Sequence, residues 1–169
     1  MENETFRSKK MELIVSYEEH EPRLKDIIAG REAPSEIEIR YIVFGGTDHR
    51  IDKRLQIFGN GFVEYSTIGD DLKVPAEEKG EYSFRLSEEE IMDLLKCFDE
   101  NGFLKMRQEE ELTPDSVYSE ICLRIGADEH CVHYYHEEDM QERYKIVKPT
   151  EYRKIEEKLT DIIVRAKKT

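Results

Sequence analysis

The sequence is poor in several residue types, with no tryptophan, five prolines and three cysteines among 169 residues. Cys97, Cys122 and Cys131 form an odd set without a CxxC pair, which argues against a secreted disulfide framework and predicts reduced thiols. No apolar run approaches about 18 residues, so a membrane span is excluded. The first ten residues are polar and hold no apolar stretch of signal-peptide length. We therefore expect a cytoplasmic protein.

Basic residues are also in deficit, with 26 Lys and Arg against 39 Asp and Glu and a formal net charge of −13. The deficit is concentrated in residues 77–142, which hold 20 acids and 6 bases. Phosphate neutralisation needs a basic patch, so nucleic-acid binding is not expected. The acidic surplus predicts either a solvated surface or a face for a basic protein partner. Three Gln and three Asn among many Glu and Lys are typical of a thermophilic source.

The chain length is that of one ordinary domain. Residues 1–35 are predicted to be an N-terminal extension, with a short strand or helix over 11–17 and a helix over 23–29. Residues 36–169 are predicted to form a single domain. Alternating apolar and polar residues predict strands over 37–43, 53–58, 62–66, 80–86, 117–125 and 129–135. The segment Gly59-Asn60-Gly61 is typical of a tight hairpin, because a strand rather than a helix follows it, and we expect no nucleotide or other cofactor there.

Two helices are predicted from capping and periodicity. Ser87 and Glu90 form a capping-box pattern at the start of the first, whose apolar face continues to Phe98. The second helix opens at Pro149-Thr150 and repeats apolar residues to Ile163. The expected fold class is α+β, an antiparallel sheet of about five or six strands with two long helices packed mainly on one face.

Ligand-type side chains are densest in residues 130–139, where His130, His133 and His136 precede three acids. Alternation along a strand puts His130 and His136 on one face and His133 on the other. A two-residue turn at Ala127-Asp128 would pair Ile125 with His130 and bring Cys122 opposite His133. These residues, His130, His133, His136 and Cys122, are the candidate metal ligands. Two converging ligands are too few for a structural zinc site, so ordinary strand histidines are the competing interpretation.

The order of three motifs resembles a domain of unknown function found in many bacterial proteins. The motifs are Gly61-Phe62-Val63-Glu64-Tyr65, the Leu86–Glu90 helix start with its LSxEE pattern, and the hairpin over 119–135. The resemblance covers about residues 36–165 and implies the fold, since its motifs are turn and cap residues. It implies no catalytic residues. Members of that family often carry a cysteine pair before the second strand, and this chain does not.

No complete catalytic constellation emerges from these patterns. We therefore expect a non-catalytic protein- or ligand-binding module rather than an enzyme. The alternative is a metal-dependent enzyme built on residues 130–139.

Overall fold

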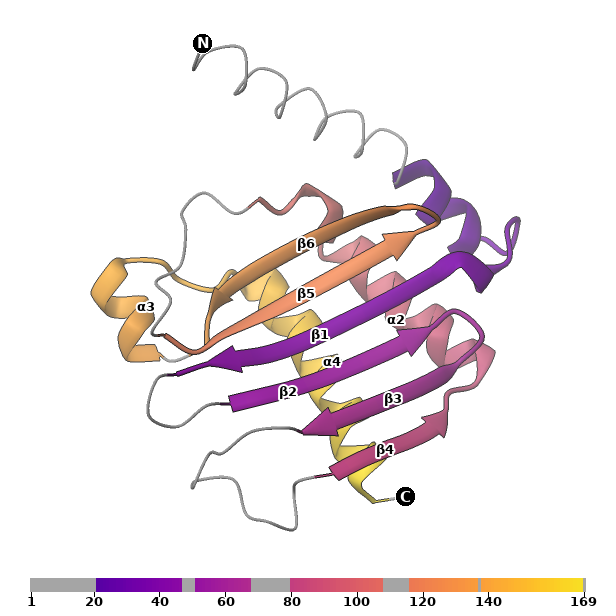
Figure 1. The fold of residues 1–169 in the computed structure, drawn as a ribbon. Helices are drawn as coiled ribbons and strands as arrows, with labels where there is room; N and C mark the ends of the chain where they lie inside the picture. Colours follow the sequence, from indigo (N-terminus) through magenta and orange to yellow (C-terminus); the bar gives the residue numbers. More distant parts are fainter. Residues whose placement is uncertain (1–20, 47–50, 68–79, 108–115, 137, 169) are drawn as a thin grey trace.

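The computed structural model describes residues 21–46, 51–67, 80–107, 116–136 and 138–168 (Figure 1). The segment 11–17 therefore lies outside the described residues, as does Glu137. The expected helix after it is present over 21–28. The elements that follow are η1 (Pro34–Glu36), β1 (Ile37–Gly45), β2 (Ile51–Phe58), β3 (Phe62–Thr67), β4 (Gly80–Arg85), α2 (Glu88–Glu100), η3 (Phe103–Lys105), β5 (Tyr118–Ile125), β6 (Asp128–Tyr135), α3 (Glu138–Tyr144) and α4 (Thr150–Lys167).

The six strands form one antiparallel sheet in the order β4-β3-β2-β1-β5-β6. Three sequential hairpins build the β1–β4 side, and β5 returns to pair with the free edge of β1. Alternation gives the sheet two different faces. The face marked by Tyr41, Leu55 and Ile121, which lie side by side across β1, β2 and β5, is buried. The expected α+β class with a six-stranded antiparallel sheet is confirmed.

Three of the described helices, the 21–28 helix, α2 and α4, contribute to a core on that buried face. Figure 1 shows α2 and α4 behind the sheet, and their inner residues share one apolar cluster with the strands. Leu24 and Ile27 of the 21–28 helix join the same cluster. One part of the prediction is wrong: α4, with 18 residues, is the single long helix among the described residues, because α2 ends after 13. None of the described helices combines the length and apolar character needed to cross a membrane.

Local chemistry explains where α2 begins. The Ser87 hydroxyl accepts a hydrogen bond from the Glu90 backbone N–H at 3.2 Å, and the Glu90 carboxylate accepts one from the Ser87 N–H at 2.7 Å. This is the predicted capping box, and it satisfies two of the donors that a helix start leaves open. Glu90 also forms an ion pair with Arg165 near the end of α4, which joins the two helices.

The β5–β6 hairpin is present, but its predicted register is wrong by two residues. The turn consists of Gly126 and Ala127, so Ile125 lies opposite Asp128 and Cys122 lies opposite Cys131. Gly126 has φ +65°, a conformation that glycine adopts without strain, and a glycine favours this two-residue turn over one at Ala127-Asp128. The prediction also missed the short helix α3, which follows directly on β6.

Candidate functional site

The second face of the sheet carries polar and aromatic side chains and lies opposite α2 and α4 (Figure 1). Several of its charges are already paired. Glu38, which is buried, accepts a hydrogen bond from Gln56 at 2.6 Å and forms an ion pair with Arg124, while Arg40 pairs with Glu129. These contacts join side chains of different strands, so they hold the charged groups of this face in fixed positions.

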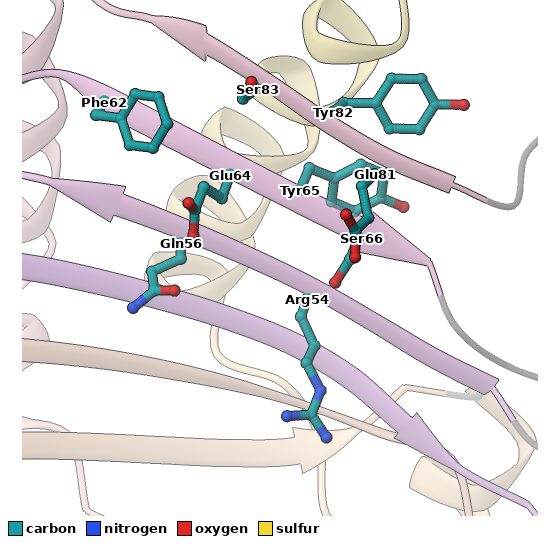
Figure 2. Close-up of a pocket in the computed structure, with 9 residues that line it drawn as sticks. All are labelled: Arg54, Gln56, Phe62, Glu64, Tyr65, Ser66, Glu81, Tyr82 and Ser83. Atoms are coloured by element: carbon teal, nitrogen blue, oxygen red, sulfur yellow. The ribbon is translucent and has the colours of Figure 1, made fainter.

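A hollow lies on this face over β2, β3 and β4, with a volume of about 520 Å³. Figure 2 shows side chains from all three strands around it. Its rim carries the exposed carboxylates of Glu64 and Glu81. Guanidinium, amide, hydroxyl and aromatic groups also line it, and they come from Arg54, Gln56, Ser66, Ser83 and Phe62. Tyr65 and Tyr82 border the hollow as well, but their rings pack in the core on the other face.

The charge of the hollow is negative. Its single guanidinium, that of Arg54, is bound to both carboxylate oxygens of Asp52 at 2.9 and 3.3 Å. Glu64 and Glu81 lie on neighbouring strands, since Glu64 pairs with Ser83 and Glu81 with Ser66. Two exposed carboxylates beside hydroxyl groups can accept hydrogen bonds from a cation, and the Phe62 ring offers an apolar contact next to them.

The structure separates the predicted metal ligands. His130 lies on the helix side, where its Nε2 is 3.0 Å from the Met106 carbonyl oxygen and its ring meets Phe103 edge-on. His133 lies on the opposite face, as alternation predicted. His136 follows the end of β6 and is exposed. The three histidines therefore do not converge on one point.

Cys122 and Cys131 are joined by a disulfide between directly opposed residues of β5 and β6, with Cα atoms 4.1 Å apart. The expectation that the thiols are reduced is therefore wrong for this pair, and Cys97 is the free cysteine. The predicted contact between Cys122 and His133 is wrong as well, because the correct register places Glu120 opposite His133. Glu120 Oε2 lies 3.8 Å from His133 Nδ1.

A second polar cluster is buried between α4 and the sheet. Lys148 Nζ donates to Glu156 Oε1 at 2.8 Å, and the Tyr41 hydroxyl donates to Glu156 Oε2 at 2.9 Å. Next to it, the Ser119 and Tyr152 hydroxyls are hydrogen-bonded at 3.0 Å. Burial alone would raise the pKa of Glu156, but the Lys148 ammonium, together with hydrogen bonds from Ser119 and Tyr41, outweighs burial and holds that pKa below its ordinary value. Burial and the Glu156 charge raise the pKa of Tyr41 well above its ordinary value.

The sequence contained a signal for part of this cluster. Glu156 lies four residues after Tyr152 and three before Leu159, both of which are buried, so the apolar stripe of α4 already placed a carboxylate among core positions. Lys148 precedes the helix and has no such periodic signal. Cys131 and Glu120 were missed as partners of Cys122 and His133 because the register was wrong.

Comparison with known proteins identifies no relative: neither a family model nor a curated protein sequence matches this chain.

Proposed function

We propose that this chain is a non-catalytic binding module, and that a basic segment of a protein partner docks in the hollow over β2, β3 and β4. The observation that carries the proposal is the hollow itself, a depression lined by three strands on the face opposite α2 and α4. The exposed carboxylates of Glu64 and Glu81 give it the charge that a Lys- or Arg-bearing segment requires.

Hydrogen-bonding groups support a peptide rather than an apolar ligand as the occupant. Ser66 and Ser83 offer hydroxyl groups that both donate and accept, so they match the N–H and C=O groups of an extended backbone. Phe62 stacks on Phe58 at a ring-centroid distance of 6.3 Å, and together they form an aromatic border. Aromatic side chains beside polar groups are typical of protein-binding surfaces.

The test is the binding of a fluorescein-labelled peptide of alternating arginine and glycine, followed by fluorescence anisotropy at low salt. The double variant Glu64→Gln, Glu81→Gln should weaken binding by about five- to tenfold, because two partly exposed ion pairs are lost. Raising the ionic strength to about 0.5 M should weaken binding of the parent protein further, since exposed charges are then screened.

The matched control is Glu100→Gln, Glu157→Gln, which makes the same charge change at exposed positions of α2 and α4. The control should change affinity by less than about twofold. Equal losses in the two double variants would show that the peptide responds only to net charge, and the proposal would then be wrong.

The metal-dependent alternative no longer rests on His130, His133 and His136 as a set, because they do not converge. Ligand-type groups do gather elsewhere on the β5–β6 hairpin, and they support a separate inference.

A further inference from the structure

Four side chains able to bind a metal form two neighbouring cross-strand pairs on one face of the β5–β6 hairpin, separated by the core-facing pair Ile121 and Val132. One pair is Cys122 and Cys131, and the other is Glu120 and His133. All four lie on the face of the sheet opposite α2 and α4. A carboxylate oxygen of Glu120 and the two sulfur atoms lie within 4.8 Å of one another, and His133 Nδ1 is 3.8 Å from the Glu120 carboxylate.

This geometry approaches that of a tetrahedral metal site. Zinc binds thiolate sulfur at about 2.3 Å and imidazole nitrogen or carboxylate oxygen at about 2.0–2.2 Å, so neighbouring ligand atoms are about 3.3–3.8 Å apart. Small side-chain rotations can produce these separations among the Glu120 oxygen and the two sulfur atoms, which already lie within 4.8 Å of one another. The His133 ring, whose Nδ1 is 3.8 Å from the Glu120 carboxylate, must also turn toward the sulfur atoms. The donor set of two sulfurs, one nitrogen and one oxygen suits zinc and related ions rather than magnesium or calcium.

The surroundings of the two sulfur atoms favour a cation. Cys122 Sγ lies 3.6 Å from a Glu120 oxygen, and Cys131 Sγ lies 3.2 Å from a Glu129 oxygen. Glu129 is already neutralised by its ion pair with Arg40, which lies on β1 opposite Cys122. If both thiols became thiolates beside the Glu120 carboxylate, three negative charges would meet, and a divalent ion would remove that repulsion.

We propose that the hairpin is a redox-controlled metal site, in which reduction of the Cys122–Cys131 disulfide creates a site for one Zn²⁺ or similar ion held by Cys122, Cys131, Glu120 and His133. Disulfide formation and metal binding exclude each other, because both use the same two sulfur atoms. The disulfide joins β5 to β6 in the oxidised state, and the metal ion joins them in the reduced state. The two strands therefore stay cross-linked in both states, while the surface charge of the hairpin changes.

The redox step needs a dithiol reductant. One thiolate of the reductant attacks the sulfur of Cys131, which is only partly buried and lies on an edge strand, and the bond to Cys122 breaks. The second thiol of the reductant then releases Cys131. Two electrons and two protons have passed to the protein, and the reductant has become a disulfide. Binding of Zn²⁺ then releases the two thiol protons to solvent.

The test is an anaerobic titration with Co²⁺ of protein carrying Cys97→Ser, so that the hairpin pair supplies the only thiols. A trialkylphosphine, which is oxidised to its phosphine oxide with water as the oxygen source, reduces the disulfide. We expect one Co²⁺ per chain, a thiolate-to-cobalt charge-transfer band, and displacement of Co²⁺ by Zn²⁺. The unreduced protein should show no such band.

Variants assign the other two ligands. Glu120→Gln and His133→Ala should each weaken Zn²⁺ binding by at least about tenfold, since even the loss of an outer-shell partner costs that much. His130→Ala, on the opposite face, should leave the affinity unchanged. Zn²⁺ should also raise the melting temperature of the reduced protein and not that of the oxidised protein.

Absence of the charge-transfer band in the reduced parent would overturn the proposal, as would equal metal affinity of the oxidised and reduced forms. Full affinity in both Glu120→Gln and His133→Ala would exclude the four-ligand site. Because these two variants keep the cysteines and the hairpin turn, the test does not depend on a cysteine variant that fails to fold.

Discussion

The ion pair between Lys148 and Glu156 allows a sharp test of the packing of α4. The Lys148 side chain is 6% exposed and that of Glu156 is 14% exposed, so neither charge is well hydrated. Glu156→Gln leaves the ammonium without its counter-charge, and removing one partner of a buried pair costs about 3–5 kcal/mol. The new amide oxygen still accepts hydrogen bonds, which offsets about 1 kcal/mol. We expect a loss of about 3 kcal/mol and a melting temperature lower by about 6–12 °C.

The pH dependence of this loss has a definite sign. The pKa of Glu156 is lowered in the folded protein, so its charge stabilises the fold above the unfolded pKa, and this stabilisation is lost as pH falls through the folded pKa. The difference in unfolding free energy between the parent and Glu156→Gln should therefore be largest near pH 7 and should shrink below about pH 4. Urea unfolding of both proteins at several pH values measures this difference.

Two further variants separate the ion pair from a general effect of changing a glutamate in α4. Glu157→Gln makes the same substitution at the next, exposed position and should stay within about 0.5 kcal/mol of the parent. Adding Lys148→Met to Glu156→Gln removes the unpaired ammonium and should recover part of the loss. Equal stability of Glu156→Gln and Glu157→Gln, or no recovery in the double variant, would refute the assignment of a buried ion pair.

Three other predictions concern the fold. Ser87→Ala removes the helix cap of α2 and should lower the unfolding free energy by about 1 kcal/mol in chemical denaturation; an unchanged value would contradict the assigned helix start. Gly59→Ala should cost more than about 3 kcal/mol, because a Cβ there would lie 1.6 Å from the Pro34 carbonyl oxygen; calorimetry would show a marked fall in melting temperature. Denatured, unreduced protein should expose only the Cys97 thiol to a thiol reagent, and three reactive thiols would rule out the disulfide.

Alternation in the sequence predicted which residues share a face, but it did not predict the register of the second hairpin. A shift of one residue would move every side chain to the other face, and the pattern excludes it. A shift of two residues leaves Ile121, Leu123 and Val132 on the same face, so the pattern permits either register. The turn residues decide, and Gly126 supplies the positive φ that Ala127 does not. The disulfide between Cys122 and Cys131 could be predicted only from the observed register, because only that register places the two cysteines opposite each other.

The capping box and the hairpin at Gly59-Asn60-Gly61 were predictable because each depends on residues a few positions apart. The sites were not, because they join distant parts of the chain. Glu64 and Glu81 become neighbours through the pairing of β3 with β4, and the Tyr41 hydroxyl of β1 meets Glu156 of α4 although 115 positions separate them. Such pairs depend on the three-dimensional course of the backbone, which periodicity does not encode.

The position of α4 after all six strands has a consequence for synthesis on the ribosome. The β1–β4 meander is complete by Arg85, and each of its pairings joins strands that are adjacent in sequence. Its apolar face is nevertheless completed by Tyr152, Ile155 and Leu159, which are made more than 60 residues after Arg85. With elongation at about 5–20 residues per second, the gap between these events lasts for seconds. During that time the growing chain presents an uncovered apolar sheet surface, a target for chaperones that bind nascent polypeptides.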